Sequence, residues 1–262
     1  TEQKQKAAAF QALHDGEPFV IPNPWDAGSA RVLAALGFKA LASTSSGFAF
    51  TLGRLDSNVT LDEVIAHAAM LDEATDLPVS VDLENGYGAD PASAALAITR
   101  VADAGAVGAS IEDYDPGGWL YEHGHAAERV AAAAEEAHRL AFPFMLTARA
   151  ENHIRGNPDL DDTIVRLQAF EAAGADVLYA PGLRSPIEIR AVCEAVSRPV
   201  NVLARPELSL AEIVEAGARR VSVGGSLTWV AVNALAAAAR EIRDRGDFSS
   251  LAPSPPLPDW FA

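Results

Sequence analysis

Residues 78–113 read PVSVDLENGYGADPASAALAITRVADAGAVGASIED, and this stretch decides the fold. It contains two short runs of apolar and small residues, Val79–Asp82 and Gly108–Glu112, that predict β-strands. Between them, Pro91–Ala104 carries apolar residues at helical spacing, with Asp90 as the expected N-cap and a glycine-containing turn at the end. A strand, a helix and a second strand in this order predict two parallel neighbours in one sheet.

The same alternation continues in both directions along the chain. Eight strands are predicted, at Phe19–Ile21, Ala40–Ser43, Val79–Asp82, Gly108–Glu112, Phe144–Ala148, Asp176–Ala180, Val200–Leu203 and Arg220–Val223. Helices are predicted after them, at Ala27–Leu36, Leu61–Thr75, Pro91–Ala104, Ala126–Leu140, Asp161–Ala173, Pro186–Val196, Leu210–Ala216 and Leu227–Arg243.

Eight β–α units in 262 residues match a (β/α)₈ TIM barrel of the α/β class. An open doubly wound sheet fits less well, because no G-x-G-x-x-G follows the first strand. We expect one barrel domain over residues 1–248 and a proline-rich C-terminal arm over residues 249–262. Within the arm, four prolines argue against a regular helix in Ala252–Trp260.

The composition excludes several classes of protein. The chain has 36 acidic and 20 basic side chains and a formal net charge of −16, which repels phosphate backbones, so no nucleic-acid partner is expected. Its single cysteine, Cys193, excludes an intrachain disulfide framework and a four-cysteine zinc site. No uninterrupted run of roughly 18 apolar residues and no signal-peptide core is found, so we expect a cytoplasmic protein without a membrane span.

Polar residues gather where the predicted strands end. In a barrel these positions converge on one mouth, where the chemistry is expected. The residues in question are Asn23, Trp25 and Asp26 after the first strand, Thr44, Ser45, Ser46 and Gly47 after the second, Asp56 in the loop beyond, Asp82 and Glu84 at the third, Glu112 at the fourth, Arg149 at the fifth and Asn201 in the seventh. We assign Trp25, Asp26, Ser45, Ser46, Gly47, Arg149 and Asn201 to substrate binding.

The acidic residues of this group suggest a metal site. Asp82 and Glu84 are two residues apart, so both carboxylates can face the same side of an extended segment, and Glu112 comes from the adjacent strand. Several carboxylates in one cavity repel one another unless a cation neutralises them, and hard oxygen ligands favour Mg²⁺. The alternative is that each of these acids is a solvated loop residue or a helix N-cap.

Arg149 follows an apolar strand and is hard to explain as a surface residue. Its planar guanidinium at a barrel mouth predicts binding of a substrate carboxylate or phosphate. The alternative is an internal salt bridge to Glu151 or Glu112. The hydroxyls and backbone N–H groups of Ser45, Ser46 and Gly47 suit an anionic group, although a serine-rich turn on its own is usually only a turn.

From Pro22 to Arg243 the chain resembles the phosphoenolpyruvate mutase/isocitrate lyase superfamily. The motifs that carry the resemblance are Asn23-Pro-Trp-Asp26, the Ser-Gly turn, Leu52-Gly53 followed by Asp56, Val81-Asp-Leu-Glu-Asn-Gly-Tyr-Gly88, Ile111-Glu-Asp113 and Thr147-Ala-Arg149. The resemblance implies a (β/α)₈ barrel whose last helix is exchanged between the subunits of a homodimer or homotetramer.

The resemblance also implies a cofactor and a type of chemistry. Mg²⁺, with Mn²⁺ as the alternative, would be held by Asp82, Glu84 and Glu112, with Asp56 in its outer coordination shell. Arg149 would bind the substrate carboxylate, and Ser45 to Gly47 would contact the oxyanion end. Such enzymes make or break C–C or P–C bonds next to a pyruvate-like unit through an enolate held on the metal.

The loop after the fourth strand departs from the family pattern. Isocitrate and methylisocitrate lyases carry Lys-Arg-Cys-Gly-His there, whereas residues 113–125 of this chain contain neither cysteine nor lysine. The Lys and Asn of the phosphonopyruvate-forming mutase are also missing. The residues of this loop that could act as general acid or base are Tyr114, Tyr121, Glu122, His123 and His125, of which we select Tyr114, His123 and His125 as candidates. The alternative is that the histidines are merely exposed. Cys193 lies in a predicted helix and is not expected to be catalytic.

The sequence therefore supports three readings. The leading hypothesis is a Mg²⁺-dependent lyase that cleaves a C–C bond of a small 2-oxo or 2-hydroxy di- or tricarboxylate by retro-aldol cleavage or decarboxylation. The second is P–C chemistry on phosphonopyruvate or carboxyphosphonoenolpyruvate. The third is a barrel that binds a small anionic carboxylate without catalysis.

Overall fold

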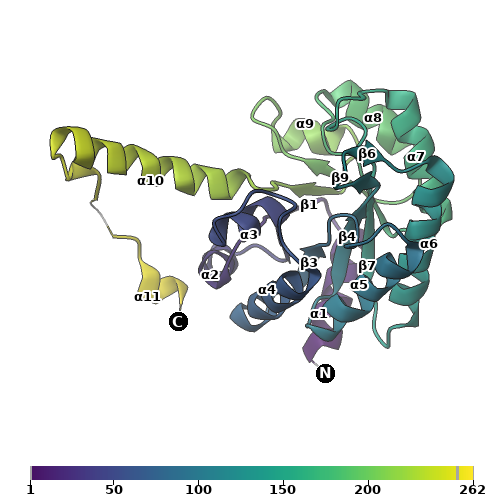
Figure 1. Ribbon diagram of the computed structural model, residues 1–262, viewed down its shortest axis with the longest axis horizontal. Helices are drawn as coiled ribbons and strands as arrows, with labels where there is room; N and C mark the ends of the chain where they lie inside the picture. The colour runs from purple at the N-terminus through teal and green to yellow at the C-terminus, as the bar shows by residue number, and fades with distance from the viewer. Residues whose placement is uncertain (1, 252–253, 262) are drawn as a thin grey trace.

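Eight parallel strands form a nearly closed barrel in the computed structural model, which describes residues 2–251 and 254–261 (Figure 1). The barrel strands are β1 (Phe19–Ile21), β2 (Leu41–Ala42), β3 (Val79–Asp82), β4 (Gly108–Glu112), β7 (Met145–Arg149), β8 (Val177–Tyr179), β9 (Val200–Leu203) and β10 (Arg220–Ser222). Their order around the sheet is β1-β10-β9-β8-β7-β4-β3-β2. The predicted TIM-barrel class is thus confirmed at the level of the strands.

One seam of the barrel, between β1 and β2, is not a regular strand ladder. Leu41 and Ala42 pair with Val79 and Ser80 of β3 only. Among the described residues, the Ala42 backbone N–H donates across the seam to the Pro22 carbonyl oxygen at 3.0 Å, and the Asn23 side-chain amide donates to the Ser43 carbonyl oxygen at 3.0 Å. The sheet therefore curls almost into a full cylinder, and its carboxyl edge becomes a ring.

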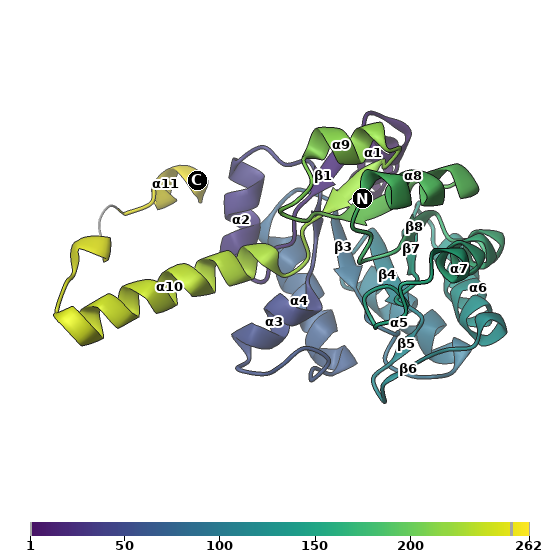
Figure 2. The same cartoon turned by 90° about the horizontal axis from the view of Figure 1, so that it is seen from above.

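Of the eight helices that follow the strands, the first seven lie on the outside of the barrel and the last, α10, projects away from it (Figures 1 and 2). They are α2 (Ala27–Ala35), α4 (Leu61–Ala74), α5 (Pro91–Asp103), α6 (His123–Arg139), α7 (Leu160–Ala172), α8 (Pro186–Ala195), α9 (Leu210–Glu215) and α10 (Ser226–Arg245). Asp26, Thr60, Ser185 and Ser209 begin four of them with capping boxes. Asp90 occupies the predicted N-cap position of α5, but its side chain makes no capping hydrogen bond.

The N-terminal helix α1 (Glu2–Asp15) closes the barrel from below and was not among the predicted helices. Its Phe10 is fully buried in a cluster with residues at the amino ends of the strands, among them Val107, Met145 and Val177. Gly108 allows this close approach, because a Cβ there would lie 2.8 Å from Phe10 Cε1. Helix α1 therefore forms the floor, at the amino ends of the strands, of the cavity that is described below.

Two further elements were predicted as loops. Ser45–Thr51 forms helix α3, so the serine-rich segment is the first turn of a helix capped by Thr44 rather than an isolated turn. After β4, Tyr114–Asp115 (β5) and Trp119–Leu120 (β6) pair as a small antiparallel hairpin. Arg129 of α6 anchors the neighbouring loop by donating to the carbonyl oxygens of Asn85, Gly88 and Ala89.

The last long helix, α10, extends away from the barrel (Figures 1 and 2). Trp229, Val230 and Leu235 are exposed on it. Beyond it lie a 3₁₀ turn, Ser249–Leu251, and one helical turn, Leu257–Trp260 (α11), which packs on α2. That turn lies inside the segment where prolines had argued against helix, while Ala252 and Pro253 lie outside the described residues. Exchange of α10 between subunits is not shown in this single chain.

Among the described residues, no helix is both long enough and apolar enough to cross a membrane.

Candidate active site

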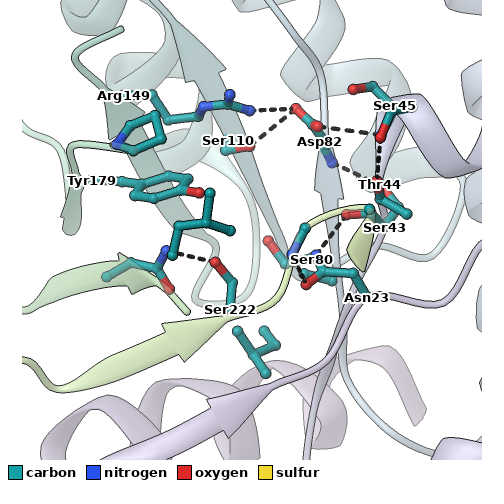
Figure 3. Close-up of a pocket in the computed structure, with 18 of the residues that line it drawn as sticks. Asn23, Ser43, Thr44, Ser45, Ser80, Asp82, Ser110, Arg149, Tyr179 and Ser222 are labelled. Atoms are coloured by element: carbon teal, nitrogen blue, oxygen red, sulfur yellow. Dashed lines mark hydrogen bonds and ion pairs between the residues drawn. The ribbon is translucent and has the colours of Figure 1, made fainter. Parts of the chain in front are cut away.

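A polar cavity of about 190 Å³ opens at the carboxyl ends of the barrel strands and reaches down between them (Figure 3). The sequence-predicted residues that line it are Ser45, Ser46, Asp56, Asp82, Arg149 and Asn201. Other lining residues include Asn23, Ser43, Ser80, Ser110, Tyr179, Arg220 and Ser222. The cavity is therefore where a barrel is expected to hold its chemistry.

Asp82, the last residue of β3, is the centre of the cavity's upper wall. Its Oδ1 accepts from Arg149 Nη1 at 3.0 Å and from the Glu84 backbone N–H at 3.2 Å. Its Oδ2 accepts from the Ser45 backbone N–H at 3.3 Å, at the start of α3 (Figure 3). The carboxylate is thus shared between the cation of Arg149, two strands away on β7, and a helix N-terminus, which also favours negative charge.

Arg149, the last residue of β7, is surrounded by acids. Its guanidinium lies 3.0 Å from Asp82 Oδ1, 3.0 Å from Glu112 Oε2 and 2.7 Å from Glu151 Oε1. Although burial lowers it, the charges of these carboxylates raise the pKa of Arg149 well above its usual range. The salt bridges considered as the alternative for Arg149 are therefore present, and Asp82 is added to them.

Glu84 lies next to this group on a constrained backbone. Its φ is +48°, a left-handed conformation that non-glycine residues rarely adopt. The hydroxyl of Tyr87 donates to Glu84 Oε1 at 3.2 Å. Burial and the charge of Asp82 raise the pKa of the Glu84 carboxyl to about 7. The side chain is held near Asp82 despite the repulsion between the two.

Glu112, the last residue of β4, completes the acidic group. Besides Arg149 it contacts Arg155, with 3.4 Å between Oε1 and Nη2. Burial raises the pKa of the Glu112 carboxyl well above its usual range, against the opposing charge of Arg149. Neither Glu112 nor Glu84 lines the cavity directly; both lie behind its wall.

The donor set fits a hard divalent cation in its chemistry, but its side chains do not converge on one point in this structure. Five carboxyl groups (Asp56, Asp82, Glu84, Glu112 and Glu151) belong to this part of the molecule, and three of them contact the two guanidinium groups of Arg149 and Arg155, so acidic groups outnumber basic ones. All ligating atoms would be oxygens, as Mg²⁺ prefers. With Arg149 bridging Asp82 and Glu112, no three acidic, histidine or cysteine side chains of the described residues converge closely enough to hold an ion.

The lower part of the cavity has a different character, and Asn201 is the substrate-binding residue that the sequence predicted there, whereas Arg220 and His14 were missed. Arg220, the first residue of β10, donates to Asn201 Oδ1 at 2.9 Å and to Thr147 Oγ1 at 2.8 Å. Its Nη1 lies 3.2 Å from Nε2 of His14, which comes from α1. Asn201 also donates to Ser222 Oγ at 2.9 Å. The available signal was a charged residue at the start of an otherwise apolar strand.

Tyr179, the last residue of β8, was also missed. It is buried and lines the cavity, and the guanidinium of Arg149 lies over its ring, with the guanidinium carbon 5.3 Å from the ring centroid. Burial raises the pKa of its hydroxyl to about 12, so the hydroxyl stays protonated at neutral pH. It is the phenol that the cavity offers to a ligand.

The three loop candidates for the general acid or base do not line the cavity. His123 Nε2 lies 2.7 Å from Asp162 Oδ1, and His125 Nε2 lies 2.8 Å from the Ala89 carbonyl oxygen. Tyr114 stacks under Arg155, 4.0 Å from ring centroid to guanidinium carbon. In this structure, all three make contacts outside the cavity.

Three residues assigned to substrate binding also lie outside the cavity wall. Asp26 accepts from the Ser29 backbone N–H and caps α2, which is the alternative considered for a strand-end acid. The Trp25 carbonyl oxygen contacts His67, and its side chain borders the base of α10. Gly47 is buried in α3, where a Cβ would lie 2.6 Å from Thr228 Oγ1, so its glycine is required by packing.

A family model described as phosphoenolpyruvate phosphomutase matches residues 10–243. Among solved structures, a Burkholderia cenocepacia J2315 protein, whose description leaves lyase and mutase open, is 49% identical. It superposes with a TM-score of 0.96 and covers 100% of this chain and 97% of its own. The structure of oxaloacetate acetylhydrolase in complex with its product oxalate is 25% identical with a TM-score of 0.87, and covers 97% and 92% of the two chains.

Curated relatives give the same family. The uncharacterized protein Rv1998c of Mycobacterium tuberculosis is 34% identical over 233 residues, which are 88% of this chain and 87% of the relative. The 2-methylisocitrate lyase of Halalkalibacterium halodurans is 30% identical over 234 residues, which are 86% and 73% of the two chains.

Proposed function

Because the chain belongs to the phosphoenolpyruvate mutase/isocitrate lyase superfamily, we propose that it is a Mg²⁺-dependent lyase. Its substrate is a small 2-oxo or 2-hydroxy di- or tricarboxylate, in which it breaks a C–C bond by retro-aldol cleavage or decarboxylation. The observation that carries the proposal is the small polar cavity at the barrel mouth, whose wall holds Asp82, Arg149 and Tyr179.

The size and lining of the cavity support a small charged substrate. Its volume of about 190 Å³ is below the roughly 300–1,000 Å³ typical of pockets for drug-sized ligands. Hydroxyl, amide, carboxylate and guanidinium groups line it. The relatives support C–C chemistry, since they include a 2-methylisocitrate lyase and an oxaloacetate acetylhydrolase that binds oxalate.

Asp82, Glu84 and Glu112 would hold Mg²⁺, directly or through water, with Asp56 in the outer shell. When bound, Mg²⁺ supplies a Lewis acid for the 2-oxo or 2-hydroxy oxygen of the substrate. The raised pKa values of Glu84 and Glu112 agree with this assignment, because burial and the neighbouring acids disfavour their charged forms, and a bound cation would offset that cost.

Arg149 and Tyr179 would act on the substrate itself. Arg149 would orient the carboxylate next to the reacting carbon, exchanging one of its present acidic partners for it. The protonated hydroxyl of Tyr179 can donate to the oxygen that gains negative charge as the C–C bond breaks. We assign this donation to Tyr179 because the three loop candidates lie outside the cavity wall.

An activity screen tests the proposal. The purified chain is incubated with Mg²⁺ and, separately, oxaloacetate, oxalomalate and 2-methylisocitrate, and pyruvate, glyoxylate and CO₂ are measured. We expect release from at least one substrate, loss of that release with EDTA, and loss in Asp82→Ala. No release from any substrate contradicts the proposal.

A second candidate is P–C bond chemistry, which the phosphoenolpyruvate phosphomutase family model favours. The same protein with Mg²⁺ and phosphonopyruvate is followed by ³¹P NMR. Conversion of the phosphonate signal to a phosphate or phosphate-ester signal, without C–C cleavage in the first screen, replaces the lyase assignment by this one.

A further inference from the structure

We propose that Arg220 at the cavity floor binds the distal anionic group of the substrate, so that the barrel selects a dianion long enough to reach from mouth to floor. This rests on the proposed function only in taking the cavity as the substrate site. The shared chemistry is a carboxylate or phosphonate at the end of the substrate away from Asp82 and Arg149.

The first support is an uncompensated charge. Arg220 is 5% exposed, and no carboxylate of the described residues lies within 4.0 Å of it. Its hydrogen-bond partners are an amide, a hydroxyl and an imidazole. Buried arginines are normally paired with acids, since removing a lone charge from water is costly. A ligand anion would supply the missing partner.

The neighbouring histidine, His14, does not supply the missing negative partner of Arg220. Nδ1 of His14 lies 2.8 Å from the Phe10 carbonyl oxygen, which can only accept, so this nitrogen carries the proton. Nε2 is then the acceptor that faces Arg220 Nη1. Burial, with the charge of Arg220, lowers the pKa of His14 to about 3, so the ring is neutral. The positive charge at the floor is unbalanced at neutral pH.

Arg220 also has hydrogen-bonding capacity left. A guanidinium has five N–H donors, and Asn201, Thr147 and His14 accept from three different nitrogens. The other buried arginine without a close acid, Arg129, differs in this respect. It donates to three backbone carbonyl oxygens, covers the face of Tyr121 and does not line the cavity. Arg220 lines the cavity, so a ligand can reach it.

The spacing of the two cations predicts the length of the ligand. Thr147, which contacts Arg220, precedes Arg149 by two residues on β7, and both side chains face the barrel interior. Two residues of a strand span roughly 7 Å. An anion that contacts both Arg149 and Arg220 therefore needs several bonds between its charged ends, as in a four-carbon dicarboxylate. Oxalate is long enough to contact only one of the two arginines.

Binding measurements on the full chain with Mg²⁺ test the proposal. Titration calorimetry with oxalate, succinate and 3-phosphonopropionate is carried out on wild type, Arg220→Met and Arg220→Lys. Arg219→Met is the matched control, because Arg219 is the neighbouring residue, is exposed and carries the same charge.

We expect Arg220→Met to weaken succinate or 3-phosphonopropionate about 10- to 100-fold, the loss of one charge-assisted contact, and oxalate less than about twofold. Arg220→Lys should lose less affinity for these two ligands, and Arg219→Met should lose none. The ligand with the larger loss identifies the distal group as carboxylate or phosphonate. Equal affinity for the long ligands in Arg220→Met and wild type overturns the proposal, as does an equal loss for oxalate and the long ligands.

Two outcomes keep this test separate from the proposed function. Chain-length-dependent binding without turnover would support Arg220 and contradict the lyase. Turnover with unchanged binding in Arg220→Met would support the lyase and contradict Arg220. If Arg220→Met does not fold, the comparison of Arg220→Lys with wild type over the same three ligands decides.

Discussion

The mouth and the floor of the cavity each contain a buried arginine, and the surroundings of the two arginines are opposite in charge character. At the mouth, Arg149 contacts three carboxylates. At the floor, Arg220 contacts only neutral groups. Both side chains line the same cavity, so the difference is not one of depth alone.

The difference shows at which end of the cavity the charges are paired within the folded chain. The mouth contains more negative than positive charge, and its arginine is satisfied without a ligand. The floor keeps a cation whose burial lowers its pKa to about 10, which still leaves it charged at neutral pH. Stability alone would favour an acid or an apolar residue there. An unpaired charge of this kind is more easily understood as part of a binding site.

Replacing each arginine by methionine gives the largest contrast. Arg149→Met leaves three buried carboxylates without their cation, and we expect it to lower the free energy of unfolding by about 3–5 kcal/mol. Arg220→Met removes an unpaired buried charge but leaves the acceptors of Asn201, Thr147 and His14 without their donor, so we expect a smaller net loss of about 1–2 kcal/mol. Urea unfolding of both variants measures this. Equal losses would remove the distinction between mouth and floor.

Removing the central acid of the mouth tests its chemistry. Asp82→Ala should reduce Mg²⁺-dependent turnover at least about 100-fold, because this carboxylate meets both Arg149 and the start of α3. Progress curves at saturating Mg²⁺ check the loss. Asp62→Ala is the matched control, since Asp62 is exposed and pairs with Arg100 on the outside. A similar loss in both variants would show a general effect of removing an acid.

The floor should make stability depend on pH. Burial and Arg220 lower the pKa of His14 to about 3 in the folded state, so between about pH 6.5 and 3 the unfolded chain binds the proton more readily. This stability is fully present above pH 6.5 and is lost as the pH falls towards 3, by about 2 kcal/mol at pH 5.

Urea unfolding of wild type and His14→Gln at pH 8 and pH 5 tests this dependence. His14→Gln should lose the part of the pH dependence of stability that is due to His14. Arg220→Met should weaken that dependence, because the positive charge of Arg220 contributes to the lowered pKa of His14. The exposed His138 provides the control variant His138→Gln. An unchanged slope in His14→Gln would contradict the interpretation.

The packing of the floor gives the smallest expected effect. A Cβ in Gly108→Ala would meet Phe10 Cε1 at 2.8 Å and the Met145 carbonyl oxygen at 2.9 Å. The phenyl ring can shift but the carbonyl cannot, so we expect a loss of about 1 kcal/mol. Gly124→Ala, which has nothing within 4 Å of the new Cβ, should be neutral or slightly stabilising. Thermal unfolding of the two variants distinguishes them.

The fold and part of the mouth could be predicted because their signals are local. Buried parallel strands are short apolar runs, so β1, β3, β4 and β9 have the predicted bounds. A polar residue at the end of an apolar strand identified Asp82 and Arg149. The period-two argument was wrong for Glu84, which lies beyond β3 with a φ of +48° and does not line the cavity with Asp82. Helix α1 was missed because it precedes the first strand and so lies outside the repeating pattern.

Apart from Asn201, the floor could not be predicted because it depends on contacts distant in the sequence. His14 and Arg220 are 206 residues apart and meet only because β1 pairs with β10 and α1 covers the barrel beneath them. The loop histidines show the converse. His123 and His125 have suitable chemistry and position in the sequence, but side-chain direction places their hydrogen bonds outside the cavity.

Helix α1 has a consequence for the order of events in a reaction that yields two products. Because α1, with its buried Phe10, closes the amino end of the barrel, substrate and products enter and leave at the carboxyl end of the strands. The fragment nearer that opening must depart first, and the fragment beside Arg220 last. In steady-state kinetics, the late-departing fragment would then inhibit competitively against substrate, and the early one noncompetitively.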